Sequence, residues 1–258
     1  MEPLSDVPLL VVLGAGRSGT TLLGEHLLSH HPEVAYWTEP NHVWNHGNLY
    51  ASSDVRGAED ADGETVDYIH EQFCDYLERH EGRILVEKTP ANSLRVPFVA
   101  RVFPEARFVH LIRDGRDVAR SAVREWRGGK KGGSRDKSIL ENLAAVGQFL
   151  YRQIVIRNLL TSIRPRQIPY YVYRALQILR TNLAGGERLW GPKIPNLARI
   201  RRNHSLLETC AIQWRECVRH SLEGIERCAA DRTLEVRYEH LLEEPADVLD
   251  RICTHADL

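Results

Sequence analysis

Three cations stand at or directly after the ends of short apolar segments, where they could bind one anionic ligand together. They are Arg17, Lys88 and Arg113. Apolar runs of four to eight residues predict buried strands, and the carboxyl ends of parallel strands meet at one edge of a sheet. The pattern therefore predicts a site for a phosphate-bearing ligand at that edge.

The first of these cations lies inside a glycine-rich loop. Residues 14–21 read Gly-Ala-Gly-Arg-Ser-Gly-Thr-Thr and stand between the apolar run 9–13 and a leucine-rich helical segment. A strand, a tight turn and a helix N-terminus together direct backbone N–H groups at one phosphate. Nucleotide triphosphatases place lysine directly after the second glycine, but here Thr20 follows Gly19 and the cation is Arg17. We therefore expect the loop to bind a phosphate group but not a triphosphate.

A second anion-binding pair follows another predicted strand. Arg113 stands at its end, and Ser121 comes eight residues later, on the second turn of a helix expected over 115–127. Asp114 is a suitable N-cap for that helix, and Asp117 can complete a capping box. A charged donor at the strand end and a hydroxyl on the helix can converge on one anion. The alternative is that Arg113 pairs with carboxylates and Ser121 is a surface residue.

Together these segments resemble the sulfotransferases that use 3′-phosphoadenosine 5′-phosphosulfate (PAPS). The run Arg-Ser-Gly-Thr-Thr is similar to their 5′-phosphosulfate loop, and the spacing of Arg113 and Ser121 is similar to that of their 3′-phosphate pair. The segment 234–242 is similar to their Tyr-Glu-Asp-Leu segment, with His240 in place of the aspartate. The resemblance implies a donor site made of Gly16, Arg17, Ser18, Gly19, Thr20, Thr21, Arg113, Ser121 and Tyr238.

Two residues of the last segment have different expected roles. In relatives the tyrosine lies near the adenine, so Tyr238 is a candidate for the donor site. A packing role at the end of the strand is the alternative for this residue. For Glu239 we expect a structural hydrogen bond and no part in catalysis.

The same resemblance assigns a catalytic base. Many relatives carry Lys-Thr-His after the third strand, with the lysine on the sulfonate and the histidine as base, but this chain has Lys-Thr-Pro at 88–90. Other branches use a glutamate just after the second strand, and the matching residue is Glu39. Desolvation by Trp37 and Trp44 would raise its pKa, which suits a general base. Capping a helix or pairing with Arg17 is the alternative.

The resemblance implies in-line transfer of the sulfonate from PAPS to a hydroxyl group, which leaves 3′-phosphoadenosine 5′-phosphate (PAP). Glu39 would remove the acceptor's proton, while Lys88, Arg17 and the loop amides would stabilise the negative charge. The expected acceptor is a carbohydrate, a glycolipid or another small hydroxylated molecule, and no metal is expected. The alternatives are a P-loop nucleotide or small-molecule kinase, which would need Mg²⁺ and a lysine in the loop, and a non-catalytic nucleotide-binding module.

The composition agrees with an enzyme built as one domain. The chain has 258 residues, 43% hydrophobic and 27% charged, which is enough to bury a full core. Its net charge of −1 argues against binding nucleic acid through bulk electrostatics. The five cysteines form no Cys-x-x-Cys pair, which is typical of buried thiols in a reducing compartment. Because neither a signal peptide nor a membrane span is evident, we expect a cytoplasmic, bacterial protein.

The segments that must position these side chains alternate between strand and helix. Strands are expected over 9–14, 34–37, 84–88, 107–112 and 233–237, and helices over 19–30, 66–80, 94–103, 115–127, 138–161, 204–228 and 246–255. This alternation predicts a three-layer, P-loop-like α/β fold, with a central parallel sheet of about five strands flanked by helices. We expect one domain over 1–258, in which an insertion over 128–205, with a basic loop at 128–135, shapes the acceptor site.

Overall fold

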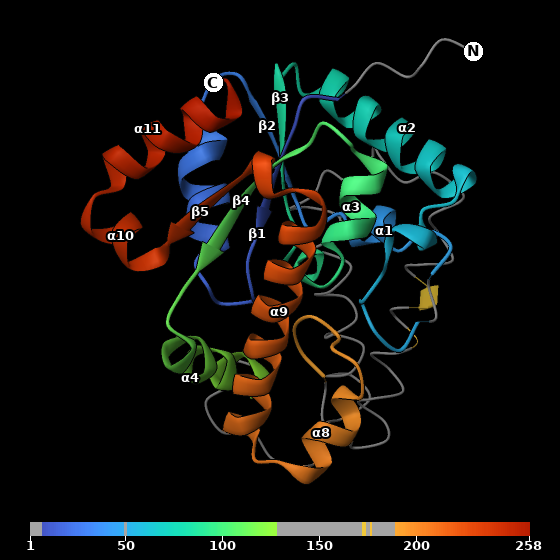
Figure 1. Cartoon of the computed structure of the whole chain (residues 1–258), viewed down its shortest axis with the longest axis vertical. Coiled ribbons are helices and arrows are strands. Elements are labelled where there is room, and N and C mark those ends of the chain that lie inside the picture. The colour runs from blue at the N-terminus through green and yellow to red at the C-terminus, as the bar shows by residue number, and fades with distance from the viewer. Residues whose placement is uncertain (1–6, 49–50, 128–171, 174–175, 177–188) are drawn as a thin grey trace, which may run out of the picture. The chain divides into compact units, whose positions relative to one another are not determined.

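The structure is a computed structural model that describes residues 7–48, 51–127, 172–173, 176 and 189–258 (Figure 1). The chain divides into two compact units, one formed by Met1–Arg124 with Gly191–Leu258 and the other by Glu125–Trp190. Apart from the last residues of helix α4, every element named below lies in the first unit. The loop at 128–135 and the helix expected over 138–161 lie outside the described residues, so the predicted insertion stays a prediction.

Five parallel strands form one sheet in the order β2-β3-β1-β4-β5 (Figure 1). The strands are β1 (Leu9–Leu13), β2 (Val34–Thr38), β3 (Ile84–Lys88), β4 (Arg107–Ile112) and β5 (Thr233–Arg237). Each strand agrees with its predicted range to within one residue. The predicted α/β class with a five-stranded parallel sheet is therefore confirmed.

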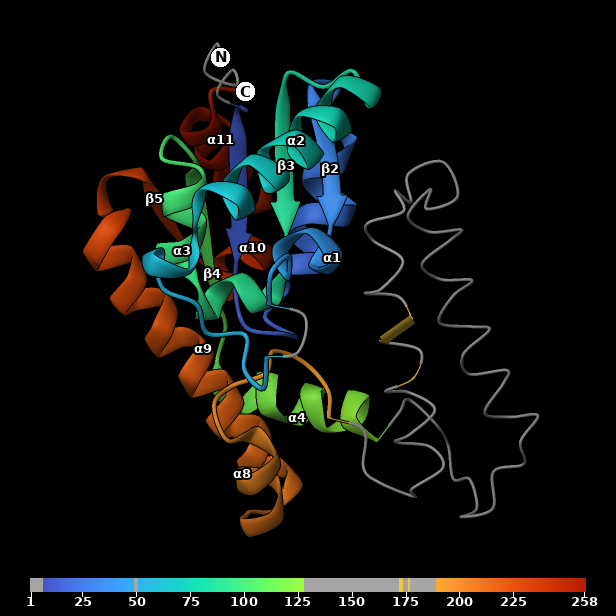
Figure 2. The same cartoon turned by 90° about the vertical axis from the view of Figure 1, so that its right-hand side faces the viewer.

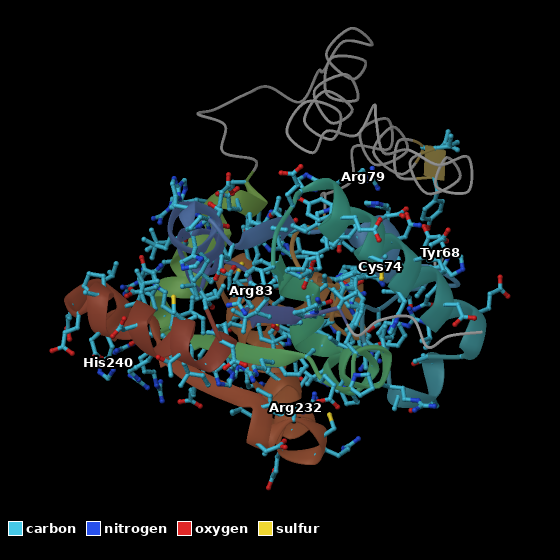
Figure 3. All side chains as sticks on the ribbon, turned by 90° about the horizontal axis from the view of Figure 1, so that it is seen from above. Tyr68, Cys74, Arg79, Arg83, Arg232 and His240 are labelled. Carbon is cyan, nitrogen blue, oxygen red and sulfur yellow. The ribbon has the colours of Figure 1, made fainter. Side chains whose placement is uncertain are left out.

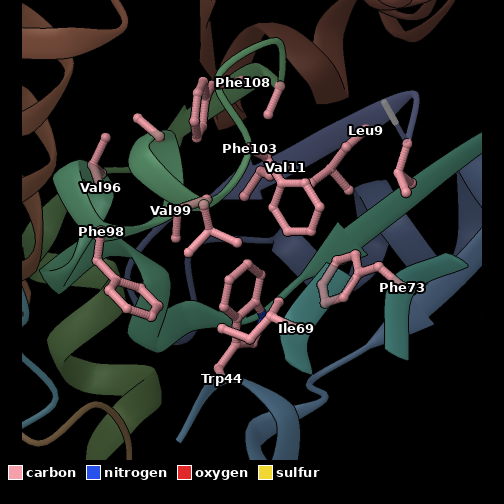
Figure 4. Close-up of a cluster of buried hydrophobic side chains, with 14 of the residues drawn as sticks. Leu9, Val11, Trp44, Ile69, Phe73, Val96, Phe98, Val99, Phe103 and Phe108 are labelled. Carbon is pink, nitrogen blue, oxygen red and sulfur yellow. The ribbon is translucent and has the colours of Figure 1, made fainter. Parts of the chain in front are cut away.

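The side chains of the central strands alternate between two buried cores, one on each face of the sheet. Leu9 and Val11 of β1 pack on one face among aromatic side chains that include Phe73 (Figure 4). Leu10 and Val12 pack on the opposite face, against the helices at the other side of the sheet. Because both faces are covered, a central strand such as β1 contains a continuous apolar run, which made it recognisable in the sequence.

Helices form the two outer layers, as Figure 1 shows with α2 and α3 on one side of the sheet and α10 and α11 on the other. The first layer holds α1 (Asn41–Trp44), α2 (Gly63–Arg79) and α3 (Val96–Val102). The second holds η1 (Leu22–Leu27), η2 (Leu28–His30), α10 (Tyr238–Glu243) and α11 (Pro245–Ala256). The remaining elements are η3 (Ala58–Asp60), η4 (Pro90–Leu94), α4 (Gly115–Trp126), α8 (Leu197–Asn203), α9 (Leu206–Cys228), which packs against α3, and η6 (Ala230–Arg232).

The helix predicted over 19–30 differs from a regular α-helix. Its middle is the π-helix η1 and its end is the 3₁₀ turn η2. Gly24 packs closely against β2 in this segment, because a Cβ atom there would lie 2.6 Å from the ring of Tyr36. The helices α1 and α10, with 4 and 6 residues, were not predicted because they are too short to show a helical repeat.

Candidate functional site

The candidate residues lie at one edge of the sheet, where the parallel strands end. The arrowheads of β1, β2 and β3 point to this edge in Figure 2. Glu39 follows β2, Lys88 ends β3, the glycine-rich loop follows β1, Arg113 follows β4 and Tyr238 follows β5. Lys88 pairs in register with Val12, one residue before the end of β1. The fold therefore brings the predicted motifs to the edge at which parallel sheets bind ligands.

The glycine-rich loop after β1 is a tight turn with two left-handed residues. Arg17 has φ 77° and Gly19 has φ 97°. The N–H of Ser18 donates to the carbonyl of Ala15 at 3.0 Å, and the N–H of Gly14 donates to the Ser93 hydroxyl at 3.1 Å. A non-glycine residue in the left-handed region costs energy and is concentrated at functional sites, so the backbone at Arg17 makes this turn a candidate functional feature.

The other residues of this loop differ in exposure. Ser18 and Thr20 are buried, and the Thr20 methyl group packs so closely on Gly14 that a Cβ there would lie 2.7 Å away. Gly16 is half-buried, and Thr21 is exposed at the N-terminal boundary of η1. The loop therefore presents part of its backbone outward while its small side chains hold its shape.

The side chain of Arg17 connects the loop to the second predicted anion-binding pair. Its Nε donates to the hydroxyl of Ser121 on α4 at 3.1 Å. The guanidinium of Arg113 donates to the Arg17 carbonyl at 3.4 Å and lies over the ring of Tyr238, 4.3 Å from its centroid. Four predicted donor-site residues from three motifs are thus in one chain of contacts. The sequence predicted the pairing of Arg113 with Ser121, but it did not predict the direct contact between Arg17 and Ser121.

Two buried polar atoms in this cluster have no hydrogen-bond partner among the described residues. They are the hydroxyl oxygen of Ser18 and the Nε of Arg113. Buried polar groups are nearly always hydrogen-bonded, and an unsatisfied one requires an explanation. Because one comes from the loop and the other from the end of β4, an anionic ligand with two separated acid groups fits the residues present.

The start of α4 differs from the predicted capping box. Asp114 accepts a hydrogen bond from the N–H of Arg116 at 2.8 Å, as expected of a cap, but its own N–H donates to Glu239 at 3.1 Å and not to Asp117. Asp117 instead forms an ion pair with Arg120, with 3.8 Å between the charged atoms. The β5–α10 segment is therefore tied to the start of α4, which agrees with a structural role for Glu239.

Arg116, which contacts Asp114, and His240, which follows Glu239, have exposed side chains. The Arg116 guanidinium lies 2.5 Å from Asp114 and lowers the pKa of that carboxyl to about 2. His240, which replaces the aspartate of the resembled segment, is exposed on α10 at the periphery of the unit (Figure 3). A histidine side chain at this position is in contact with solvent and is compatible with the fold.

Lys88 and Glu39 form an ion pair at the ends of adjacent strands. The Lys88 Nζ lies 3.0 Å from Glu39 Oε1, and the two side chains are 3% and 37% exposed. The backbone N–H of Glu39 also donates to the Lys88 carbonyl at 2.8 Å. Glu39 has φ 49°, in the left-handed region. The Glu39 carboxylate contacts Lys88, which places two of the three predicted catalytic side chains in direct contact.

The two tryptophans that were expected to desolvate Glu39 also make contacts with other residues. Trp37 stacks on the ring of Tyr76, with 4.1 Å between ring centroids. Trp44 is fully buried in the core of Figure 4, and its indole N–H donates to Glu87 at 3.0 Å. The indole N–H of Trp44 is thus used by Glu87, while the Glu39 carboxylate contacts the buried ammonium group of Lys88. The desolvation of Glu39 by these two rings stays a prediction.

Sequence reasoning gave no role to Glu87, which is fully buried on β3. Besides the Trp44 indole, the Thr89 hydroxyl and the Asn92 amide donate to its carboxylate, the latter at 2.8 Å. Burial raises the pKa of Glu87 to about 7, against the lowering effect of its hydrogen bonds. An acidic residue inside an otherwise apolar strand was the signal that could have identified it.

Comparison with known proteins identifies the family. The Sulfotransferase family model matches residues 8–170, which is more than half of the chain. This chain therefore belongs to the sulfotransferase family.

Curated relatives match the chain over part of their length. Protein-tyrosine sulfotransferase 1 of Danio rerio is 28% identical in an alignment of 131 residues that covers 46% of this chain and 36% of that protein. Nodulation protein NoeE of Sinorhizobium fredii is 28% identical in an alignment of 142 residues that covers 48% of this chain and 33% of that protein. The matched part of this chain thus spans about a third of the length of these relatives.

Solved sulfotransferase structures have the same fold. The sulfotransferase domain from the curacin biosynthetic pathway has a TM-score of 0.51 and 14% identity, with 96% of this chain and 73% of that chain covered. Sulfotransferase STF9 from Mycobacterium avium has a TM-score of 0.51 and 16% identity, with 98% and 64% covered. None of the helices that the structure describes combines the length and apolar character needed to span a bilayer.

Proposed function

We propose that this sulfotransferase uses PAPS as its donor and transfers the sulfonate to a hydroxyl group of a small molecule or carbohydrate. The observation that supports this most is the contact of Arg17 with Ser121 at 3.1 Å, which joins the glycine-rich loop to the second anion-binding motif. A donor with phosphate groups at both its 5′ and 3′ positions needs two such motifs side by side. The unsatisfied Ser18 hydroxyl and Arg113 Nε each supply a donor atom for such groups.

The donor-binding residues divide between the two ends of the ligand. Gly16, Arg17, Ser18, Gly19, Thr20 and Thr21 would hold the 5′-phosphosulfate through backbone N–H groups, hydroxyls and one guanidinium. Arg113 and Ser121 would hold the 3′-phosphate, and Tyr238 would lie beside the adenine. PAPS supplies an activated sulfonate and a stable leaving phosphate when it is bound. The residues of this chain would bind and align these groups and compensate their charge.

Lys88 and Glu39 are the proposed centre of the chemistry. The Lys88 ammonium is almost completely buried, so its charge acts in an environment of low dielectric constant. An ammonium there stabilises developing negative charge more strongly than it does in water. Glu39 is held against it through one oxygen, Oε1. The second oxygen of the Glu39 carboxylate can take the proton of the acceptor hydroxyl while Oε1 keeps the ion pair with Lys88.

The acceptor is proposed by class only. A carbohydrate, a glycolipid or another small hydroxylated molecule is expected, in a cytoplasmic, bacterial setting. One relative is named as a protein-tyrosine sulfotransferase, so phenolic hydroxyl groups belong in the same screen. No metal is needed, because the proposed transfer uses only alignment, cations and one carboxylate.

A nucleotide kinase and a non-catalytic nucleotide-binding module are the competing functions. Thr20 occupies the position at which a kinase loop needs its lysine. A module without chemistry would not need a carboxylate and an ammonium paired beside the loop. Calorimetric titration with PAP in EDTA, and separately with ATP and Mg²⁺, distinguishes these functions. We expect PAP to bind without metal, and strong Mg²⁺-dependent binding of ATP with no binding of PAP would refute the sulfotransferase proposal.

A further inference from the structure

The fully buried carboxylate of Glu87 connects three elements behind the Lys88–Glu39 pair. Its Oε1 accepts hydrogen bonds from the Trp44 indole of α1, at 3.0 Å, and from the Thr89 hydroxyl. Its Oε2 accepts one from the Asn92 amide of η4, at 2.8 Å. Successive residues of a strand point to opposite faces, so Glu87 faces the core of Figure 4 while Lys88 faces the other side of the sheet.

The donors around Glu87 have fixed directions. The Asn92 amide cannot turn over, because its Oδ1 accepts a hydrogen bond from the Nε of the fully buried Arg95 at 2.8 Å. An indole N–H can only donate, so Trp44 also requires an acceptor. The Thr89 hydroxyl is the one member of this set that can reverse its role. The arrangement therefore calls for an acceptor at both oxygens of Glu87, which an ionised carboxylate provides.

These contacts lead directly to Glu39. The helix α1 is a single turn that starts two residues after Glu39, and the N–H of Trp44 at its end donates to the Pro40 carbonyl at 3.1 Å. The Trp44 carbonyl is held in turn by the buried guanidinium of Arg56 at 3.0 Å. Glu87 thus holds the far end of the turn that carries Glu39, and it immediately precedes Lys88 in β3.

The charged groups near Glu87 come from several elements. Lys88 lies on its own strand, Arg95 follows η4, and the phenol of Tyr36 comes from β2. Arg56 lies near Arg95 and shares the same buried region. Burial raises the pKa of Glu87 to about 7, while Arg95 and Lys88 favour the anion. Small changes near neutral pH therefore alter the fraction of ionised Glu87.

We propose that Glu87 is a positioning residue for sulfonate transfer, whose carboxylate holds the α1 turn and thereby keeps Glu39 in register with Lys88. This inference rests on the proposed function, because it concerns the same site. Among the described residues, the hydrogen bonds of the Glu87 carboxylate come from Trp44, Thr89 and Asn92 and not from Lys88. Glu87 therefore acts on the Lys88–Glu39 pair through these three residues. A misplacement of about 1 Å in such a site can cost on the order of 10²-fold in rate.

Glu87→Gln tests this arrangement with almost no change of volume. In either orientation of the new amide its NH₂ group meets a donor that cannot reverse, either Asn92 or Trp44. One contact is therefore lost, and the turn carrying Glu39 loosens. Tyr76→Phe is the control, because it removes a partly buried hydrogen bond to the Tyr36 carbonyl beside the same core but does not involve Glu87.

Nuclear magnetic resonance reads the positioning without any acceptor. The chain has five tryptophans, and the Trp44 indole signal can be assigned with Trp44→Phe. In the wild-type protein this signal should shift with a midpoint at about pH 7, and in Glu87→Gln it should not. The Lys88 ammonium signal, assigned with Lys88→Arg, should move in Glu87→Gln and stay in place in Tyr76→Phe. An unmoved Lys88 signal in Glu87→Gln would overturn the positioning role.

Turnover separates this role from simple stabilisation of the fold. PAP release from PAPS is measured with 4-nitrophenol as the hydroxyl acceptor and, in parallel, with water alone. We expect Glu87→Gln to lose about 10- to 100-fold in kcat, to lose the dependence on pH near 7, and to bind PAP within twofold of the wild type. Equal kcat and the same pH profile would refute the inference, and so would a parallel loss of PAP binding. If the wild type itself binds no PAP, the proposed function fails, while the spectra still decide whether Glu87 positions the Lys88–Glu39 pair.

Discussion

The ring of Tyr238 lies directly against the backbone of Gly19, so that a Cβ atom on this glycine would stand 2.3 Å from the ring. Gly19 also has φ 97°, a backbone conformation that residues with a Cβ atom rarely adopt. The first loop of the chain and the segment after β5 are therefore packed together, and the guanidinium of Arg113 covers the same ring. Disturbing Gly19 should disturb both ends of the donor site.

Gly19→Ala should weaken PAP binding and lower stability, because the methyl group is strained and overlaps the ring of Tyr238. Overpacking and backbone strain cost roughly 1–3 kcal/mol each. Thermal unfolding and calorimetry with PAP measure the two losses. Gly63→Ala is the control, since a Cβ at Gly63 meets no atom within 4 Å. If Gly19→Ala matches Gly63→Ala in both measurements, the contact with Tyr238 has no energetic importance.

Arg113→Ala should weaken PAP binding by about 2–5 kcal/mol if its guanidinium pairs with a buried phosphate. The fold should survive, because Arg113 lies at the end of a strand and outside both hydrophobic cores. Arg113→Lys should recover part of the affinity through its charge but lose the planar contact with Tyr238. The exposed Arg116 supplies the control Arg116→Ala. Unchanged PAP affinity in Arg113→Ala would move the 3′-phosphate site to another part of the chain.

Glu39→Gln should lower turnover by about 10²–10⁴-fold, because the amide keeps the shape but cannot accept the proton of the acceptor. PAP binding should remain nearly normal. Turnover on a verified acceptor and calorimetry with PAP measure the two effects separately. Glu33→Gln, at the opposite end of β2 and in an exposed pair with Arg83, is the control. Activity close to the wild type would exclude Glu39 as the base and make His42 and His46 the next candidates.

The stability of the protein should fall between about pH 4.5 and 7 because of Glu87. Its pKa is about 7 in the folded protein and 4.5 in the absence of structure. Since the folded state holds this proton over a pH range in which the unfolded state has lost it, raising the pH favours unfolding. Glu87→Gln removes this contribution, so the unfolding free energy of the variant should decline less steeply with pH. The two slopes should differ by up to about 1.4 kcal/mol per pH unit. Urea unfolding of both proteins from pH 5 to 7.5 measures the slopes, and parallel curves would contradict the raised pKa.

Much of the fold was predictable because the three central strands, β1, β3 and β4, are buried on both faces. The run Leu9–Leu13 is apolar throughout and ends at a glycine-rich turn, while β3 ends at Lys88 and β4 ends directly before Arg113. The predicted donor-site residues also came together, since their positions follow from the order of strand ends. The spacing of residues within each motif was therefore sufficient to predict the strands and the grouping of the donor-site residues.

The contacts that sequence reasoning missed depend on packing between distant segments. Asp114 takes Glu239 as its partner because β4 and β5 are neighbours, whereas the sequence offered only the nearby Asp117. The Trp44 indole N–H donates to Glu87, because β3 supplies a buried acceptor for it. Local rules give no information about an acceptor that another strand supplies.

The strand order has a consequence for how this enzyme could change its specificity. Glu39 follows β2 and Tyr238 follows β5, and these are the two outermost strands of the sheet. On the proposed function, the proton-accepting end and the nucleotide end of the reaction are therefore carried by opposite edge strands, with the Tyr238 ring reaching Gly19 after the central strand β1. We therefore expect substitutions around β2 to change which hydroxyl compound is recognised while PAP binding stays the same. Acceptor choice and donor binding would then be separable properties of one sheet.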